Sequence, residues 1–153
     1  WIAEEGSVIK ISGHLLKRSI MGSDFSFEDM MESHKLSEIY EVTLAGEEKI
    51  RDEECYILDL ESAKENAPYA RQKIWVGKDD FLPYKYEYYA LSGRLIKSAE
   101  VLETRRVDDK RFPVKMKMND ELRKDSFTVF DLKDLKLNVQ IPEEVFSRQN
   151  LLK

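Results

Sequence analysis

The sequence predicts a mainly β fold: a curved antiparallel sheet or incomplete β-barrel with a short helical lid. Three observations support this. Apolar runs of strand length follow one another with turn residues between them, the long crossovers that parallel strands need are missing, and few segments have helical character. With 153 residues, 42% of them hydrophobic and 36% charged, the chain is predicted to form one globular domain over residues 1–153.

Seven runs rich in aliphatic, aromatic and β-branched residues are the predicted strands. They are Ile39–Leu44, Glu54–Leu60, Arg71–Val76, Leu82–Leu91, Arg94–Arg106, Phe112–Met118 and Asp125–Phe130. We expect Gly46 to begin a charged loop after the first run, and Ser92-Gly93 has the composition of a tight hairpin turn. The connections are short, so consecutive runs should pair as an antiparallel meander.

Two segments are helical candidates. Phe25 to Ser33 follows a turn at Gly22, and Ser26 and Asp29 have the spacing of a capping box with Asp in place of the usual Glu or Gln. Near the end of the chain, Pro142 stands at a plausible first position of a helical turn. The predicted lid is therefore small.

The chain begins at Trp1, and the residues from Trp1 to Ile11 have strand character with nothing in front of them. We expect the domain to lack its N-terminal part, and Trp1–Ile11 to be an exposed or exchanged sheet edge.

Composition argues against several function classes. The net charge of −5, with basic residues interspersed among acidic ones, disfavours nucleic acid as a partner. Cys55 is the only cysteine, which excludes an internal disulfide and a multi-cysteine zinc site, and its strand-like surroundings predict a buried structural thiol. We expect no cofactor and no metal, and no run of apolar residues is long enough to cross a bilayer.

A catalytic constellation is likewise missing from the sequence. The pairs Asp79-Asp80 and Asp108-Asp109 fall at predicted turns, where solvated carboxylates are common. The tyrosines between Tyr84 and Tyr89 could form a stacking platform for sugars or bases, but strand aromatics usually serve packing. The protein is therefore predicted not to be an enzyme.

Three stripes of large apolar side chains alternate with polar residues along predicted strands. They are Phe112, Val114, Met116 and Met118; Leu82, Tyr84, Tyr86 and Tyr88; and Tyr56, Leu58 and Leu60. Each stripe could be ordinary core. Together they make one apolar face that is broad for so small a lid, and this mismatch favours a hydrophobic cavity between face and lid.

The string Met21-Gly22-Ser23-Asp24-Phe25-Ser26-Phe27-Glu28-Asp29-Met30 resembles the signature of the outer-membrane lipoprotein-sorting (LolA/LolB-like) family. In that family a Met-Gly-Ser-Asp-Phe segment, an aromatic residue and a Glu-Asp pair precede the strand meander. Four later segments are similar to the family in the same order: Lys73–Val76 with its tryptophan, Tyr89–Leu95 around Gly93, Pro113–Met116, and Ile141–Ser147.

The resemblance implies a periplasmic carrier, with outer-membrane association left open, that shields acyl chains of lipoproteins or lipids in a cavity. The implied partners are a lipidated protein or a lipid, a transient membrane contact, and an inner-membrane transporter as a further option. The residues we expect to line the cavity are Trp75, Tyr84, Tyr86, Phe112, Val114, Met116 and Met118. The alternatives are a non-enzymatic accessory module of a membrane transporter and a lipid esterase, for which no triad is found.

Overall fold

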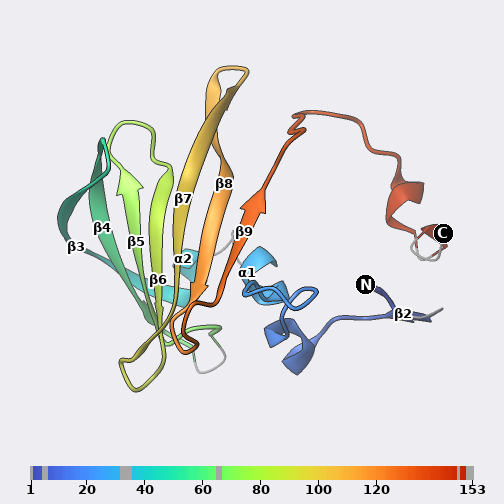
Figure 1. Cartoon of the computed structure of the whole chain (residues 1–153), viewed down its shortest axis with the longest axis horizontal. Coiled ribbons are helices and arrows are strands. Elements are labelled where there is room, and N and C mark those ends of the chain that lie inside the picture. Colours follow the sequence, from blue (N-terminus) through green and yellow to red (C-terminus); the bar gives the residue numbers. More distant parts are fainter. Residues whose placement is uncertain (1, 5–6, 32–35, 65–66, 148, 151–153) are drawn as a thin grey trace.

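A seven-stranded antiparallel sheet, in strand order β3-β4-β5-β6-β7-β8-β9, forms the body of the protein (Figure 1). The computed structural model describes residues 2–4, 7–31, 36–64, 67–147 and 149–150. The strands are β3 (Tyr40–Ile50), β4 (Glu53–Ser62), β5 (Arg71–Gly77), β6 (Pro83–Tyr89), β7 (Leu95–Val107), β8 (Lys110–Asp120) and β9 (Phe127–Asp131). The predicted mainly β, antiparallel meander is confirmed.

The boundaries of the first strand differ from the prediction. Ile39 is the last residue of a helical turn, and β3 continues to Ile50, well past Leu44. The register with β4 shifts between Leu44 and Gly46, and Gly46 has φ 155°. The predicted loop at Gly46 is thus wrong: the glycine forms a β-bulge that lets the strand bend and continue.

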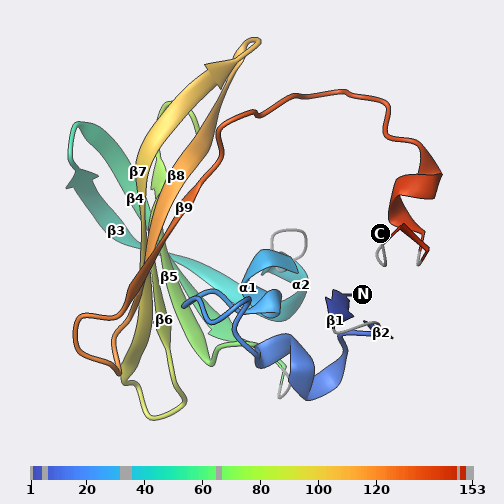
Figure 2. The same ribbon diagram turned by 45° about the vertical axis from the view of Figure 1, so that its right-hand side comes forward.

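Short helical pieces lie on one side of the sheet (Figure 2). They are the 3-10 turn η1 (Gly13–Lys17), α1 (Phe27–Met31) and α2 (Leu36–Ile39), while η3 (Glu143–Phe146) stands apart near the C-terminus. The predicted helix Phe25–Ser33 is confirmed over Phe27–Met31, and its last two residues lie outside the described ranges. Pro142 lies one residue before η3 rather than at its predicted first position, and its carbonyl accepts the hydrogen bond of the Val145 N–H at 3.0 Å.

The predicted capping box is present. The Ser26 hydroxyl accepts a hydrogen bond from the Asp29 N–H at 3.1 Å, and the Asp29 carboxylate accepts one from the Ser26 N–H at 2.7 Å. These two bonds satisfy backbone donors that a short helix leaves open. The box therefore fixes where α1 begins.

Cross-strand pairing assigns each side chain to one of two faces. One continuous row across the sheet is Leu44, Leu58, Ile74, Tyr86, Ala99, Met118 and Thr128. The neighbouring row points the other way and is Ile57, Trp75, Lys85, Glu100, Lys117 and Val129. We call the side of the first row the covered face, because the helices pack on it, and the other side the opposite face.

The core of the covered face has two parts. Cluster 1 joins Phe25, Tyr69, Tyr88, Ala99 and Met118, with Ile20, Tyr86, Ile96, Met116 and Phe130 packed against it. Cluster 2 joins Tyr40, Leu60 and Ile74, with Leu36 and Ile39 of α2 beside them. Tyr86 packs against both, so the two clusters form one apolar layer between sheet and helices.

The opposite face carries a smaller cluster of Cys55, Trp75 and Tyr84. Cys55 is fully buried, as predicted for a structural thiol, and burial raises its pKa. At the end of this face Arg51, in the β3–β4 turn, donates hydrogen bonds to Glu100 (2.7 Å) and to the Leu102 carbonyl (3.0 Å). The β3–β4 hairpin thus bends over the opposite face.

At the start of the chain, β1 (Ile2–Glu4) and β2 (Ser7–Ile9) pair with each other as a separate two-stranded sheet. The expected role of Trp1–Ile11 as an exposed or exchanged edge stays a prediction. Within the described ranges, no helix is both long and apolar enough to cross a bilayer.

Candidate functional site

A lid made of residues 19–31 covers the middle of the covered face. It consists of a turn, closed by a bridge between Ser19 and Ser26, and of α1. The Ile20 N–H donates to the Phe25 carbonyl at 2.8 Å, and the Ser23 N–H donates to the Ile20 carbonyl at 2.9 Å. Gly22, with φ 77°, allows the reversal at the turn. The family-like string from Met21 onward is therefore the lid itself.

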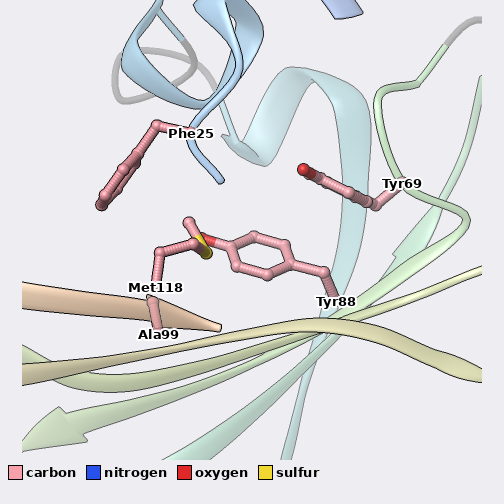
Figure 3. Close-up of a cluster of buried hydrophobic side chains, with 5 residues drawn as sticks. All are labelled: Phe25, Tyr69, Tyr88, Ala99 and Met118. Atoms are coloured by element: carbon pink, nitrogen blue, oxygen red, sulfur yellow. The ribbon is translucent and has the colours of Figure 1, made fainter. Parts of the chain in front are cut away.

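Phe25 is the apolar centre of the lid and points at the sheet (Figure 3). Its ring lies 6.1 Å from that of Phe130, centroid to centroid, in a tilted arrangement. Below it, Met118 and Tyr88 form the floor (Figure 3). Three tyrosines extend this layer along the sheet. The ring centroid of Tyr88 lies 4.5 Å from that of Tyr69 and 6.0 Å from that of Tyr86, on which it is stacked.

A buried carboxylate fastens the turn of the lid to the far end of the sheet. Asp24 accepts hydrogen bonds from the hydroxyls of Ser126 (2.8 Å) and Thr128 (2.9 Å) and from the Arg123 guanidinium (3.0 Å). Its own N–H donates to the Thr128 hydroxyl at 2.9 Å. We call this set the Asp24 latch, and it joins the lid to β9 and to the β8–β9 turn.

A second buried carboxylate fastens α1 at the other side of Phe25. Asp29, whose side chain is 3% exposed, accepts a hydrogen bond from the Tyr69 hydroxyl at 2.5 Å and pairs with the Lys97 ammonium at 2.8 Å. We call this set the Asp29 latch. The lid is thus polar where it meets the sheet at its margins and apolar in between.

An apolar groove of about 590 Å³ opens beside cluster 1. It runs between the β4–β5 loop and the β6–β7 hairpin and is lined by Ser62, Ala63, Lys64, Ala67, Pro68, Tyr69, Ala70, Tyr89, Ala90, Leu91 and Ile96. Tyr69 and Ile96 also pack in cluster 1, so the groove reaches the layer under the lid. Its volume is in the range of small-molecule sites.

Two other hollows have a different chemistry. One of about 150 Å³ on the opposite face is bordered by the ion pairs of Arg111 with Glu53 (3.1 Å) and Asp80 (3.0 Å). One of about 520 Å³ at the β8–β9 turn is lined mainly by charged and polar side chains. Neither suits an apolar ligand, since desolvating charged groups costs free energy. Among the described residues, no group of three His, Cys, Asp or Glu side chains is placed to hold a metal ion.

The structure brings together three of the predicted site residues. Tyr86, Met116 and Met118 lie side by side on the covered face in cluster 1. Burial raises the pKa of Tyr86 to about 12, so its phenol is neutral at physiological pH. Val114 is buried and Phe112 is half-buried farther along β8, and both are outside the three clusters. Whether any of these residues contacts a ligand stays a prediction.

Trp75 and Tyr84 lie elsewhere, and the expectation that they share the face of Tyr86 is wrong. Trp75 points to the opposite face, where its indole N–H donates to Glu48 at 2.6 Å and the Lys85 ammonium lies 4.1 Å from its ring centroid. Tyr84 also points to the opposite face, because the register between β5 and β6 shifts after Trp75. Its ring joins Trp75 and Cys55, and its hydroxyl donates to Asp80 at 2.7 Å.

Sequence reasoning missed the lid side of the site. Phe25 and Asp24 stand in the family-like string, but no local pattern predicted their contacts with the sheet. Tyr69 lies in the loop before β5, where no periodic pattern marks it, and Phe130 lies in β9, for which no inward face was predicted. The alternation along β6 did place Tyr88 beside Tyr86, which pointed to this layer.

Comparison with known proteins places the chain in a family. A family model whose description reads "Uncharacterized protein" matches residues 1–153, and the chain belongs to this family. A DUF1329 family protein from Desulfovibrio piger is 31% identical, with a TM-score of 0.88 over 97% of this chain and 62% of that protein. No match was found among curated proteins.

Two further solved structures have the same fold. A LolA superfamily protein from Nitrosomonas europaea is 26% identical, with a TM-score of 0.75 over 98% of this chain and 66% of that protein. A Vibrio parahaemolyticus domain, provisionally assigned as outer membrane lipoprotein-sorting, is 24% identical, with a TM-score of 0.81 over 94% of this chain and 60% of that protein. The LolA-like resemblance is confirmed, and the chain spans about three fifths of the first two relatives' lengths.

Proposed function

We propose that this member of the DUF1329-like family is a non-enzymatic periplasmic carrier that binds acyl chains of lipoproteins or lipids between its lid and its sheet. The proposal rests on the structure of the lid. A small segment that packs Phe25 and Ile20 on the sheet covers a layer of aromatic and methionine side chains and is fastened by two polar latches.

The chemistry of such binding is burial of apolar surface. Each methylene transferred from water is worth roughly 0.8 kcal/mol, so eight methylenes contribute about 6 kcal/mol. Met116 and Met118 suit a site that must accept and release a flexible chain, because methionine adapts to irregular space. The open groove beside Tyr69 and Ile96 offers a path to this layer without unfolding the sheet.

The LolA-like relatives support the proposal at the level of fold. An acyl chain attached to a protein or to a headgroup would enter along the groove, with its polar part left at the surface near Lys64. The partners we propose are therefore a lipidated protein or a lipid, with a transient membrane contact at loading. A membrane transporter that supplies the cargo is a further partner in this proposal.

A matched pair of charge substitutions tests the site. Met116→Glu places a carboxylate on the covered face in cluster 1, whereas Val129→Glu places the same charge on the opposite face of the neighbouring strand. A fluorescent fatty-acid analogue, displaced by unlabelled fatty acid, reports binding. We expect Met116→Glu to weaken probe binding at least tenfold, or about 1.4 kcal/mol, and Val129→Glu to leave it unchanged.

Thermal midpoints of the same proteins separate a binding site from packed core. A hydrated carboxylate in an adaptable site leaves the fold intact, so the midpoint of Met116→Glu should stay near that of Val129→Glu. If the wild type binds no probe and Met116→Glu unfolds the domain, the carrier proposal fails. The domain would then act as an accessory interaction module of a membrane transporter.

A further inference from the structure

The Asp29 latch is a small carboxylate-binding site that the lid fills with its own side chain. The Tyr69 hydroxyl donates to one oxygen of the Asp29 carboxylate at 2.5 Å, and the Lys97 ammonium donates to the other at 2.8 Å. The same ammonium lies 5.9 Å from the centroid of the Tyr69 ring. A hydroxyl and an ammonium thus converge on the two oxygens of one carboxylate, a strong arrangement for this group.

Both donors belong to parts of the protein outside the lid. Tyr69 lies in the β4–β5 loop, and Lys97 lies on β7. The Lys97 side chain is only 21% exposed, and within the described ranges its one ion pair is with Asp29. A lid that opens therefore leaves a largely buried cation without its counter-ion, which is costly.

The other acidic groups near Lys97 cannot take the place of Asp29. Asp120 is its cross-strand partner on β8, but the Asp120 carboxylate accepts hydrogen bonds from the Arg123 guanidinium and the Leu122 N–H. Burial raises the pKa of the Glu28 carboxyl, and the nearby Lys97 ammonium opposes this shift. Glu28 belongs to α1, so it leaves with the lid.

The lid itself shows which ligand would fit. It places one apolar group, Phe25, and one carboxylate, Asp29, on the covered face, four positions apart in one segment. Figure 3 shows Phe25 and Tyr69 on the two sides of Tyr88 and Met118, with the Tyr69 hydroxyl pointing inward. The apolar layer therefore ends at the hydroxyl that binds the carboxylate. A molecule with an apolar chain and a terminal carboxylate matches both features.

The groove leads to the same donors. Tyr69 lines it, as does Ile96, the residue before Lys97 on β7. None of the described lining residues is acidic, and one of them, Lys64, is basic. A carboxylate that enters along the groove therefore meets no repelling charge from these residues.

We propose that the carrier prefers free fatty acids, whose carboxylate replaces that of Asp29 between Tyr69 and Lys97. The chain then takes the place of Phe25 on the apolar layer. This inference rests on the proposed function, because it needs the same opening of the lid, and it names the ligand class that is bound most tightly. An acyl chain without a free carboxylate would leave Lys97 without a counter-ion.

A comparison of dodecanoic acid with dodecanol at neutral pH tests the preference. Both displace a neutral fluorescent acyl probe, and we expect the acid to bind about tenfold more tightly or better, because hydrogen bonds to charged groups are strong. Lys97→Gln should reduce the affinity for the acid to that for the alcohol. Lys117→Gln removes a cation from the opposite face of the sheet and is the matched control, which should keep the preference.

A second variant guards against a misfolded lid. Lys97→Gln alone leaves the Asp29 carboxylate buried without its cation. The double substitution Asp29→Asn with Lys97→Gln replaces the ion pair by two neutral amides, and a thermal midpoint checks that the protein is folded. This variant should still bind the alcohol and should show no preference for the acid.

The outcomes separate this inference from the carrier proposal. If the wild type binds neither compound, both fail. If it binds the acid and the alcohol equally, only the fatty-acid preference fails. A preference that survives in the double variant would overturn the inference. So would a preference that Lys64→Gln abolishes and Lys97→Gln does not, since the carboxylate would then bind at the surface of the groove.

Discussion

The Asp24 latch can be removed with one substitution, Asp24→Ala. The change deletes the acceptor of the Ser126 and Thr128 hydroxyls and of the Arg123 guanidinium. A hydrogen bond to a charged group contributes about 1.5–3 kcal/mol. Arg123 is 63% exposed, so its ion pair adds little, and the two hydroxyls can turn to water. We therefore expect closure of the lid to weaken by about 2–3 kcal/mol.

Amide hydrogen exchange measures this loss at the lid. The N–H groups of Ile20 and Phe27 are bonded to the carbonyls of Phe25 and Arg18, and both should exchange when the lid opens. A weakening of 2–3 kcal/mol corresponds to exchange that is roughly 30- to 150-fold faster. The Ile74 amide in the middle of the sheet should keep its wild-type rate. Opening should also speed the association of a fatty-acid probe.

The control removes an exposed carboxylate from the same strand that the latch grips. Asp131→Ala deletes a β9 side chain whose closest ion-pair partner, Lys115, is 3.9 Å away, and it should change none of these rates. Faster exchange of Ile74 to the same extent as Ile20 would mean that lid and sheet unfold together. Unchanged exchange at Ile20 would mean that the latch contributes nothing, and either result refutes a separable lid.

Three further predictions concern the rest of the fold. A bidentate contact with Arg71 lowers the pKa of Asp59. The pair therefore stabilises the fold fully above the unfolded-state pKa of about 4, and this contribution disappears as the pH falls through the lower folded-state pKa. Asp59→Asn should flatten the acid side of a pH–stability curve measured by urea unfolding. Cys55 should react with a thiol reagent only upon unfolding, because burial both shields the sulfur and raises the pKa of the thiol. Fast labelling of the native protein would contradict this prediction. Gly77→Ala should destabilise the fold by about 1–3 kcal/mol, because the new Cβ would lie 2.5 Å from the Asp80 carboxylate and 2.8 Å from the Tyr84 ring. An unchanged thermal midpoint would show that both side chains move aside freely.

Local sequence patterns predicted the parts of the structure that depend on near neighbours. The strands follow from runs and turn residues, and the capping box follows from the spacing of Ser26 and Asp29. The faces of Tyr86, Met116 and Met118 follow from simple alternation, because β6 and β8 are regular around these residues. In each case the deciding contacts lie within a few residues or between adjacent strands.

Local patterns could not predict the irregularities of strand register or the contacts between residues far apart in the sequence. The register shift after Trp75 moves Tyr84 to the other face, and a shift of this kind leaves no mark on the alternation of the strand itself. The bulge at Gly46 likewise turns an expected loop into strand. The Asp24 latch joins residues 104 positions apart, so only the folded chain reveals that this aspartate fastens the lid to β9.

The strength of the lid decides whether a ligand could open it. Burying the Phe25 side chain stabilises closure by about 1.5–3 kcal/mol, and the Asp24 latch adds about 2–3 kcal/mol by the reasoning above. The Asp29 latch, a buried carboxylate with two partners, adds a similar amount. Ordering the lid residues opposes these gains, so the net preference for closure is smaller than their sum. An acyl chain that buries eight methylenes gains about 6 kcal/mol. A ligand of that length could therefore displace Phe25 while the sheet, which is held by its own ladder, stays folded.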